Sequence, residues 1–238
     1  MKSVPLTELT DFPTLAAVRR AAPGRSVGAL PRVPSPLGRR RNRLVKRAID
    51  LGISTLAILL LFPWLLPLAA LLIRLDSRGP VFFRQQRHKR NGRLFTCYKL
   101  RSMVVNAYAD THPCFEGDPR ITRVGSFLRR THLDELPQLF NVWCGDMSLI
   151  GPRPHMHADH RLFCTLADHY DLRHEVKPGI TGLAQVAGFF GATHDAAAIR
   201  ARLAHDLHYI HHWSPRLDAR ILLQTAGRIL RPRRTTRL

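Results

Sequence analysis

The chain has 238 residues, of which 45% are hydrophobic, enough for one domain with a tail or for two small domains. It carries 37 Lys and Arg against 17 Asp and Glu, a formal net charge of +20. Such a charge predicts an anionic partner, which is a nucleic acid, an anionic membrane surface or a phosphorylated substrate. Four cysteines without any CxxC spacing argue against a disulfide-rich secreted domain and against a zinc motif.

The first 44 residues have the composition of a poorly ordered segment. They hold six prolines and end in a cluster of arginines and lysines that continues to residue 47. Residues 1–31 lack the charged start, apolar run and cleavage site of a secretory signal. We therefore expect a disordered basic, proline-rich segment over residues 1–44, and a basic tail over residues 231–238 at the other end.

An uncharged run of 23 residues, Leu51–Ile73, is long enough to cross a hydrocarbon core of about 30 Å. Pro63 and Pro67 lie within it, and each removes a helical hydrogen bond and bends the axis. Both flanks are rich in arginine, and such an excess marks cytoplasmic flanks. The run would then enter the membrane, bend near Pro63 and return. We predict a re-entrant membrane helical hairpin over residues 45–75 rather than a true span.

Residues 80–103 show the pattern of a β-hairpin. Val81–Phe83 precede the turn signal Asn91-Gly92, and Leu94, Phe95, Cys97 and Tyr98 follow it. From Pro119 onward the chain has the pattern of short helices and loops. The predicted fold class is therefore α+β and mainly helical, with one folded domain over residues 76–230.

Two helices are expected near the C-terminus. Residues 195–213 place apolar side chains at helical spacing, and Ser214-Pro215 is typical of a helix start. The second helix sets Leu217, Ile221 and Leu222 beside arginines. This stripe suits a membrane interface, as an interfacial amphipathic helix, or equally the core of the domain.

The most informative stretch is Arg129–Pro154, which holds the adjacent acids Asp134 and Glu135. Proline is tolerated in the first turn of a helix, so Pro137 places the helix start, with Asp134 as its N-cap. A carboxylate there is stabilised by backbone N–H groups, and it can attack phosphorus or hold a divalent metal. The alternative is that Asp134 only caps the helix.

Basic residues surround this acidic pair in the sequence. Arginine suits bidentate contact with phosphate, although a solvated basic face has the same composition. The candidates for phosphate contact are Lys99, Arg101, Arg129, Arg130 and Arg153.

A family resemblance now becomes visible between about Lys46 and Arg228. It rests on long motifs in order: KRAIDLGIS, DSRGPVFFRQQRHKRNGRLFTCYKLRSM, DPRITRVGSFLRRTHLDELPQLFNVWCGDMSLIGPRP, KPGITGLAQV and HDLHYIHHWSPRLDARILLQT. These motifs closely resemble the bacterial sugar transferases, the monotopic polyprenyl-phosphate glycose phosphotransferases, in their minimal catalytic form.

The resemblance implies an enzyme, a phosphoglycosyl transferase that starts exopolysaccharide, O-antigen or other glycan assembly. It implies transfer of a sugar-1-phosphate from a UDP-sugar to polyprenyl (undecaprenyl) phosphate through a phosphosugar on an aspartate, with Mg²⁺ as cofactor. It also implies a cytosolic catalytic domain on the bacterial inner membrane, with membrane lipids and downstream glycosyltransferases as partners. A homodimer stays open, as do the sugar and the pathway.

Carried over residue by residue, the resemblance implies these roles. Asp134 takes the place of the nucleophile and metal ligand, and Glu135 that of its catalytic partner. The positions of the phosphate- and substrate-binding basic residues are taken by Lys99, Arg101, Arg129 and Arg153.

Two departures from the family pattern bear on function. The helix break reads Phe62-Pro63 where the family often has Ser-Pro, so a hydroxyl that would satisfy the freed carbonyl is missing. After GPRP comes HMHADH, and His155, His157 and His160 make a transition-metal site conceivable.

Two other classes of protein were weighed against the transferase. A membrane-anchored nucleic-acid-binding protein explains the charge, but no nucleic-acid motif is present and no nucleic-acid partner is expected. A catalytically silent scaffold of a polysaccharide assembly complex is disfavoured by the intact acidic pair and its arginines.

Overall fold

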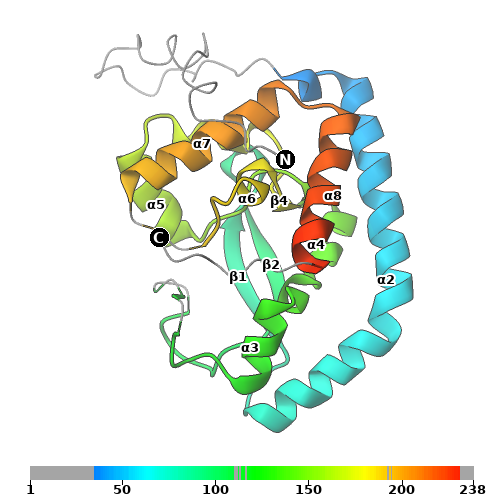
Figure 1. Cartoon of the computed structure of the whole chain (residues 1–238), viewed down its shortest axis with the longest axis vertical. Coiled ribbons are helices and arrows are strands. Elements are labelled where there is room, and N and C mark those ends of the chain that lie inside the picture. Colours follow the sequence, from blue (N-terminus) through cyan, green and yellow to red (C-terminus); the bar gives the residue numbers. More distant parts are fainter. Residues whose placement is uncertain are drawn as a thin grey trace.

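The computed structural model describes residues 35–109, 112, 114–115, 117–191, 193 and 195–230. Disorder was predicted for residues 1–44; residues 1–34 of that segment, and the tail predicted for 231–238, lie outside the described residues. Within the described part, residues 36–38 form a short 3-10 helix and a long helix begins at residue 40, so the prediction was wrong there. The chain forms a mainly helical α+β fold, as predicted (Figure 1). Its elements in chain order are η2 (Pro36–Gly38), α2 (Arg40–Asp76), β1 (Phe82–His88), η3 (Arg90–Gly92), β2 (Leu94–Leu100), α3 (Arg123–Arg130), η4 (Leu133–Glu135), α4 (Gln138–Cys144), β3 (Ser148–Ile150), α5 (His157–Leu166), η5 (Tyr170–Glu175), β4 (Gly179–Thr181), α6 (Leu183–Val186), α7 (Ala196–His211) and α8 (Pro215–Leu230).

The apolar run forms α2, one continuous helix of 37 residues with Pro63 and Pro67 inside it. It begins at Arg40, so residues 40–44 are helical and the predicted boundary at residue 45 was too late. Figure 1 shows the helix bent about midway, and the second part then passes beneath the domain. A bend was predicted, but two antiparallel helices were not formed, so the hairpin expectation was wrong in that respect.

Both ends of α2 are fastened to the same folded body. Near its start, the Lys46 ammonium pairs with the buried Asp218 carboxylate of α8 at 2.7 Å. At its other end, the Arg101 guanidinium of the segment after β2 donates to the carbonyls of Ser77 at 2.7 Å and Ile73 at 3.3 Å. Since the last carbonyls of a helix have no partner within it, Arg101 acts as a side-chain cap for α2.

The predicted β-hairpin is confirmed. β1 and β2 pair antiparallel with Phe82 opposite Leu100 and His88 opposite Leu94. Asn91 and Gly92 both have positive φ, 62° and 69°, which is the conformation that Asn-Gly turns favour.

A second, two-stranded sheet pairs β3 with β4 in parallel, and it was not predicted. Each strand has three residues, and the two strands are separated by about thirty residues in the sequence. The backbones approach so closely that a Cβ atom at Gly179 would overlap the backbone nitrogen of Gly151. The glycines of the GPRP and KPGITG motifs therefore permit this pairing.

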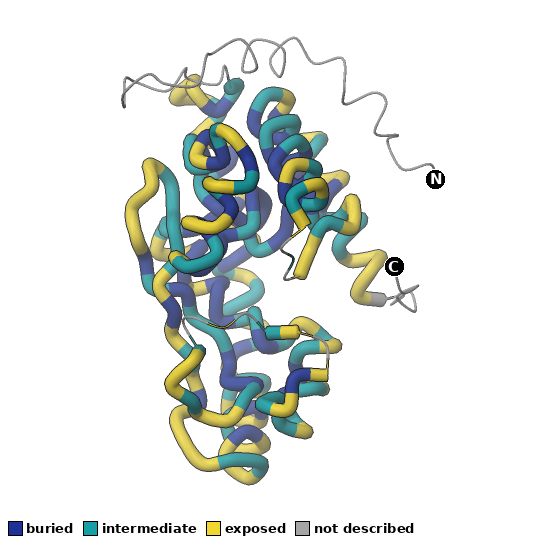
Figure 2. The backbone as a smooth tube through the Cα atoms, turned by 90° about the vertical axis from the view of Figure 1, so that its left-hand side faces the viewer, coloured by how far each residue is buried: buried dark blue, intermediate teal, exposed yellow. Residues whose placement is uncertain are grey.

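The main core lies where α2, the hairpin, α4 and the two C-terminal helices meet. Figure 2 shows the buried stretches on the inner sides of these elements. α7 and α8 were both predicted, and Ser214 Oγ accepts from the backbone N–H of Leu217 at the start of α8. Ile221 is fully buried, with Leu217 and Leu222 packed beside it. The core alternative is therefore correct for this stripe, whereas contact of the helix with a membrane interface stays a prediction.

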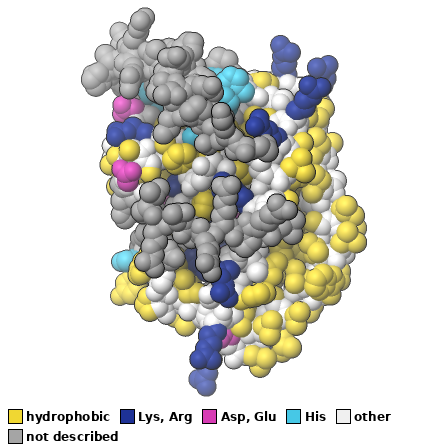
Figure 3. All heavy atoms as spheres, in the orientation of Figure 1, with side chains coloured by type: hydrophobic (Ala, Val, Ile, Leu, Met, Phe, Trp, Pro, Cys, Tyr) yellow, Lys and Arg dark blue, Asp and Glu magenta, His cyan; other side chains and the backbone are white. Residues whose placement is uncertain are grey.

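An exposed apolar surface follows α2. Figure 3 shows hydrophobic side chains gathered on the side of the molecule where Figure 1 places this helix. Its most apolar 18-residue window has a mean hydropathy of 2.6 and is only 17% buried. The exposed side chains include Leu56, Leu59, Leu60, Trp64, Leu68, Leu71 and Leu75. An exposed apolar surface this long indicates association with a membrane.

Candidate active site

The acidic pair lies in a short turn between α3 and α4. His132, with φ of 57°, begins the 3-10 turn η4, which places Asp134 and Glu135 one after the other. α4 begins only at Gln138, with Pro137 at its N-cap position. The prediction that Asp134 caps this helix was therefore wrong, because Pro137 starts the helix one turn later. A non-glycine residue in the left-handed region is uncommon, and such strain is frequent at active sites.

Glu135 is held from two sides by basic residues that the sequence predicted. Its Oε1 accepts from Lys99 Nζ of β2 at 2.6 Å and from Arg153 of the loop after β3 at 2.5 Å. A second Arg153 nitrogen reaches Oε2 at 3.2 Å. Burial alone would raise the pKa of Glu135, but the charges of Arg153 and Lys99 outweigh it and hold that pKa well below the usual range. Glu135 is thus a fixed anion that orders two cations.

Asp134 has the opposite character. Only 7% of the residue is exposed, and this burial raises the pKa of its carboxyl, more than the charges of Lys99 and Arg129 lower it. The neighbouring Glu135 charge raises it further. Among the described residues, no side chain donates a hydrogen bond to the Asp134 carboxylate. A buried carboxylate whose partners are engaged elsewhere is available to react with a substrate.

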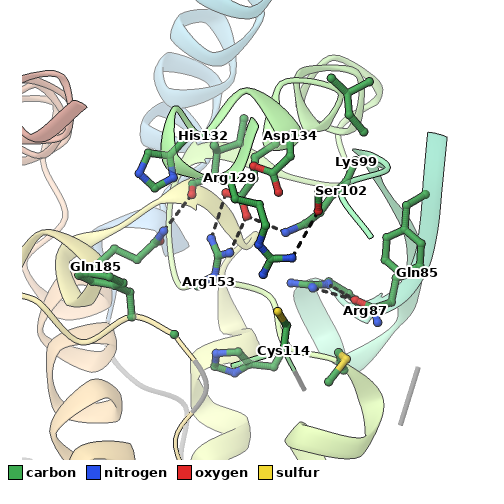
Figure 4. Close-up of a pocket in the computed structure, with 18 of the residues that line it drawn as sticks. Gln85, Arg87, Lys99, Ser102, Cys114, Arg129, His132, Asp134, Arg153 and Gln185 are labelled. Atoms are coloured by element: carbon green, nitrogen blue, oxygen red, sulfur yellow. Dashed lines mark hydrogen bonds and ion pairs between the residues drawn. The ribbon is translucent and has the colours of Figure 1, made fainter. Parts of the chain in front are cut away.

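Arg129 and Arg101 were both predicted to bind substrate, but their guanidinium groups lie in different surroundings. Arg129 stands in the last turn of α3 and points into the site beside Asp134 (Figure 4). Within the described part of the chain, its hydrogen bond goes to Ser102 Oγ, at a long 3.3 Å. Arg101 borders the same cavity, but its guanidinium binds the end of α2. Its contact with phosphate stays a prediction.

These groups line one cavity of about 1060 Å³. It brings together all six predicted site residues, which are Lys99, Arg101, Arg129, Asp134, Glu135 and Arg153. Apolar side chains of α8, Leu222 and Ile229, form another part of its wall. The cavity therefore offers cations and a carboxylate beside an apolar surface.

Sequence reasoning missed Arg87 as a site residue. Its guanidinium lies in the cavity, held by Gln85 Oε1 at 2.8 Å and by the Pro154 carbonyl at 2.6 Å (Figure 4). Gln85 and Arg87 are alternate residues of β1, so they share one face of the hairpin. That alternation was visible in the sequence and could have indicated Arg87. Further cavity residues had no signal: Cys114, His132, Gln185 and Arg202.

The loop that carries Arg153 is braced by a buried ion pair. Arg173 donates to the Arg153 carbonyl at 2.8 Å and pairs with Asp206 at 2.7 Å. His155 lies against this pair, with its Nδ1 2.7 Å from the Arg173 guanidinium. Burial and the neighbouring arginines hold the pKa of His155 well below its usual range. Both ring nitrogens of His155 face arginines, and no metal-binding group of the described residues joins His155 to His157 and His160, so a metal site from those three was a wrong expectation.

The geometry of the cavity and of α2 indicates a class of protein. A carboxylate that accepts no hydrogen bond from any described side chain faces a cavity lined by cations, and this suits nucleophilic attack on a phosphoryl group whose charge the cations neutralise. The exposed apolar helix places such a site next to a membrane. The class is a membrane-associated phosphoryl-transfer enzyme.

The comparisons agree with this class. The family described as "Bacterial sugar transferase" matches residues 41–232, and the chain belongs to that family. A UDP-glucose:undecaprenyl-phosphate glucose-1-phosphate transferase of Xanthomonas campestris pv. campestris is 47% identical over 189 residues, which is 79% of this chain and 39% of that protein. An undecaprenyl-phosphate galactose phosphotransferase of Salmonella typhimurium is 38% identical over 216 residues, 84% of this chain and 43% of that protein.

A third relative is covered by this chain over almost its whole length. The exopolysaccharide production protein PSS of Rhizobium leguminosarum bv. phaseoli is 47% identical over 190 residues, which is 76% of this chain and 93% of that protein. The first two relatives are thus matched over about two fifths of their length.

Proposed function

We propose that this protein transfers a sugar-1-phosphate from a UDP-sugar to undecaprenyl phosphate. The observation that carries the proposal is the buried Asp134 carboxylate, without a hydrogen-bond partner among the described residues, beside cations that the Glu135 anion holds in place. The names of the relatives, which specify undecaprenyl phosphate as acceptor, support the same reaction. As in the resemblance, the transfer would start exopolysaccharide or O-antigen assembly.

The reaction proceeds in two displacements. An Asp134 carboxylate oxygen attacks the phosphorus that carries the sugar, the bond from this phosphorus to the bridging oxygen breaks, and UMP leaves with that electron pair. An oxygen of the lipid phosphate then attacks the same phosphorus. The aspartyl–phosphorus bond breaks, which releases the lipid-linked diphosphate sugar and restores the Asp134 carboxylate. Each step exchanges one phosphorus–oxygen bond for another, so no oxidant or reductant is needed.

The cations act by position and charge. Within the described residues Arg129 makes one long side-chain hydrogen bond, to Ser102, so it can turn its guanidinium to the diphosphate. Lys99 and Arg153 stay near Asp134 through their contacts with Glu135. Because both oxygens of Glu135 are engaged and its pKa is lowered, we assign it as a positioning residue rather than a proton carrier.

The donor set also fits Mg²⁺. This ion prefers oxygen ligands and is usually held by one or two carboxylates together with substrate phosphates. Asp134 offers such an oxygen, whereas the oxygens of Glu135 are taken by Lys99 and Arg153. When bound, Mg²⁺ would neutralise charge on the diphosphate and on the leaving UMP.

The geometry of α2 supports a re-entrant path on the cytosolic face of the inner membrane. Lys46 near its start and the carbonyls at its end are bound by side chains of one domain. With its ends on opposite sides of a membrane, α2 could not keep both contacts. The bend at the prolines lets the apolar helix enter one leaflet and return.

The test is UMP release without a lipid acceptor. Purified protein mixed with UDP-glucose and Mg²⁺ should release UMP in an amount limited by the enzyme, with a phosphosugar adduct on Asp134 detected by mass spectrometry. Asp134→Asn should abolish both signals. If UMP forms only when polyprenyl phosphate is also present and no adduct appears, direct attack by the lipid phosphate replaces the covalent step.

A further inference from the structure

A cluster of histidines lies apart from the residues that line the cavity, where β1, α5 and η5 meet. The rings of His88 and His174 lie 4.3 and 4.8 Å from the ring of His160, between centroids. The cluster is completed by His157, Cys164 and Asp171. The transfer reaction makes no use of these six residues.

Three of these side chains present metal-binding atoms to one another. His160 Nε2 lies 3.0 Å from Asp171 Oδ1 and 3.5 Å from Cys164 Sγ. Cys164 Sγ lies 4.0 Å from Asp171 Oδ2. Ligands at zinc–nitrogen, zinc–oxygen and zinc–sulfur distances lie about 3.3–3.5 Å apart around a tetrahedral ion. With one ligand atom taken from each side chain, the three atoms all lie within 4.8 Å of one another, so small side-chain rotations would bring them to the spacing that such an ion requires.

His174 can supply a fourth ligand from beside Asp171. His174 is one turn after Asp171 in η5, and its Nδ1 lies 3.6 Å from Asp171 Oδ1. His88 and His157 are paired with each other, Nε2 to Nδ1, at 3.0 Å. His174 is thus the better placed fourth ligand, and the other two histidines would surround the site.

The ring of His160 is oriented by these contacts. Its Nε2 faces Asp171 and Cys164, and this is the nitrogen proposed as a ligand. Its other nitrogen, Nδ1, is buried and has no hydrogen-bond partner among the described residues.

We propose that His160, Cys164, Asp171 and His174 bind one divalent transition-metal ion of the Zn²⁺ class. A mixed nitrogen, sulfur and oxygen donor set suits zinc, whereas Mg²⁺ takes oxygen ligands. The ion would fasten α5 to η5, and α5 directly follows the loop that carries Arg153. This proposal stands independently of the transfer reaction, because its test uses no activity.

The test is metal binding by the full chain in detergent. Protein stripped with a chelator is dialysed against Zn²⁺ with excess Mg²⁺ present, and bound zinc is measured by elemental analysis. One zinc per chain is expected, together with a higher melting temperature, because a ligand that binds the folded state stabilises it. Co²⁺ in place of Zn²⁺ should show a sulfur-to-metal charge-transfer absorption.

The variants separate this site from any other. Cys164→Ser and Asp171→Asn change partly exposed side chains and should each weaken zinc binding at least tenfold, and Cys164→Ser should remove the charge-transfer band. His212→Asn is the matched control, since His212 belongs to another stacked pair, with His208. Melting of each variant without metal verifies its folding. Unchanged zinc binding in both cluster variants, or no zinc in the wild type, would overturn the proposal.

Discussion

At the scale of single residues, the site consists of two adjacent carboxyls with opposite environments. Glu135 is ion-paired and has a lowered pKa, whereas Asp134 is buried with a raised one. Pairs whose environments push their pKa values apart often divide the roles of an active site. The sequence predicted both residues, but it could not show which one the cations would bind, because Lys99 and Arg153 come from distant segments.

The raised pKa of Asp134 predicts that its charge destabilises the fold at neutral pH. A carboxyl whose pKa is raised in the folded state binds more protons in that state than in the unfolded one. The free energy of unfolding therefore increases as pH falls through the folded-state pKa. Asp134→Asn should therefore raise the melting temperature at pH 7 while abolishing transfer, and its advantage should shrink at acidic pH. The exposed Asp168→Asn serves as control and should change neither property. Thermal melts at pH 5 and 7 measure this, and a lower melting temperature at pH 7 would contradict it.

Arg129 provides a second prediction with a neighbouring control. Arg129→Ala should cost about 2–4 kcal/mol of transition-state stabilisation, roughly thirtyfold to a thousandfold in kcat/KM, as loss of a charge stabiliser does. Arg130 is the next residue of α3 and is exposed, so Arg130→Ala should keep near-normal activity. Transfer of labelled sugar to polyprenyl phosphate measures both. Equal activities would place Arg129 on a solvated basic face.

At the scale of elements, local signals were sufficient for some parts and not for others. The Asn91-Gly92 turn and the Ser214-Pro215 start act within a few residues, and both were predicted correctly. The β3–β4 pairing joins segments about thirty residues apart, and the αL conformation of His132 that starts η4 has no sequence pattern of its own. The capping of α2 by Arg101 is also a contact between distant segments.

The bend of α2 is expected to depend on Pro63. Proline has no N–H for the carbonyl of Leu59, and Pro63→Leu would restore this bond and straighten the helix. A straight α2 would draw its end away from Arg101, so transfer activity in membranes should fall at least tenfold. The conservative Leu72→Val, on the exposed part of the same helix, should retain activity. Normal activity of Pro63→Leu would show that the bend is fixed by other contacts.

At the scale of the whole molecule, composition indicated an anionic partner, and the structure distributes its charge accordingly. Cations line the cavity while α2 presents an almost uninterrupted apolar surface. The sequence alone could identify the apolar run, but not that both of its ends are bound to one domain, since Asp218 and Arg101 are far from it in the chain. Because both ends of α2 are bound to one domain, the side of the membrane on which each end lies can be predicted.

Both ends of α2 should lie on the same side of the membrane. Single cysteines replacing the exposed Arg41 and Arg78, in a background without the native cysteines, mark the two ends. A membrane-impermeant maleimide added to spheroplasts should label neither, and it should label both after lysis, because on the proposed re-entrant path both ends stay in the cytosol with the domain that binds Lys46 and caps α2. A periplasmic protein with an exposed cysteine verifies access of the reagent. Labelling of position 41 alone in intact spheroplasts would mean a true span, in which the contact of Lys46 with Asp218 could not exist.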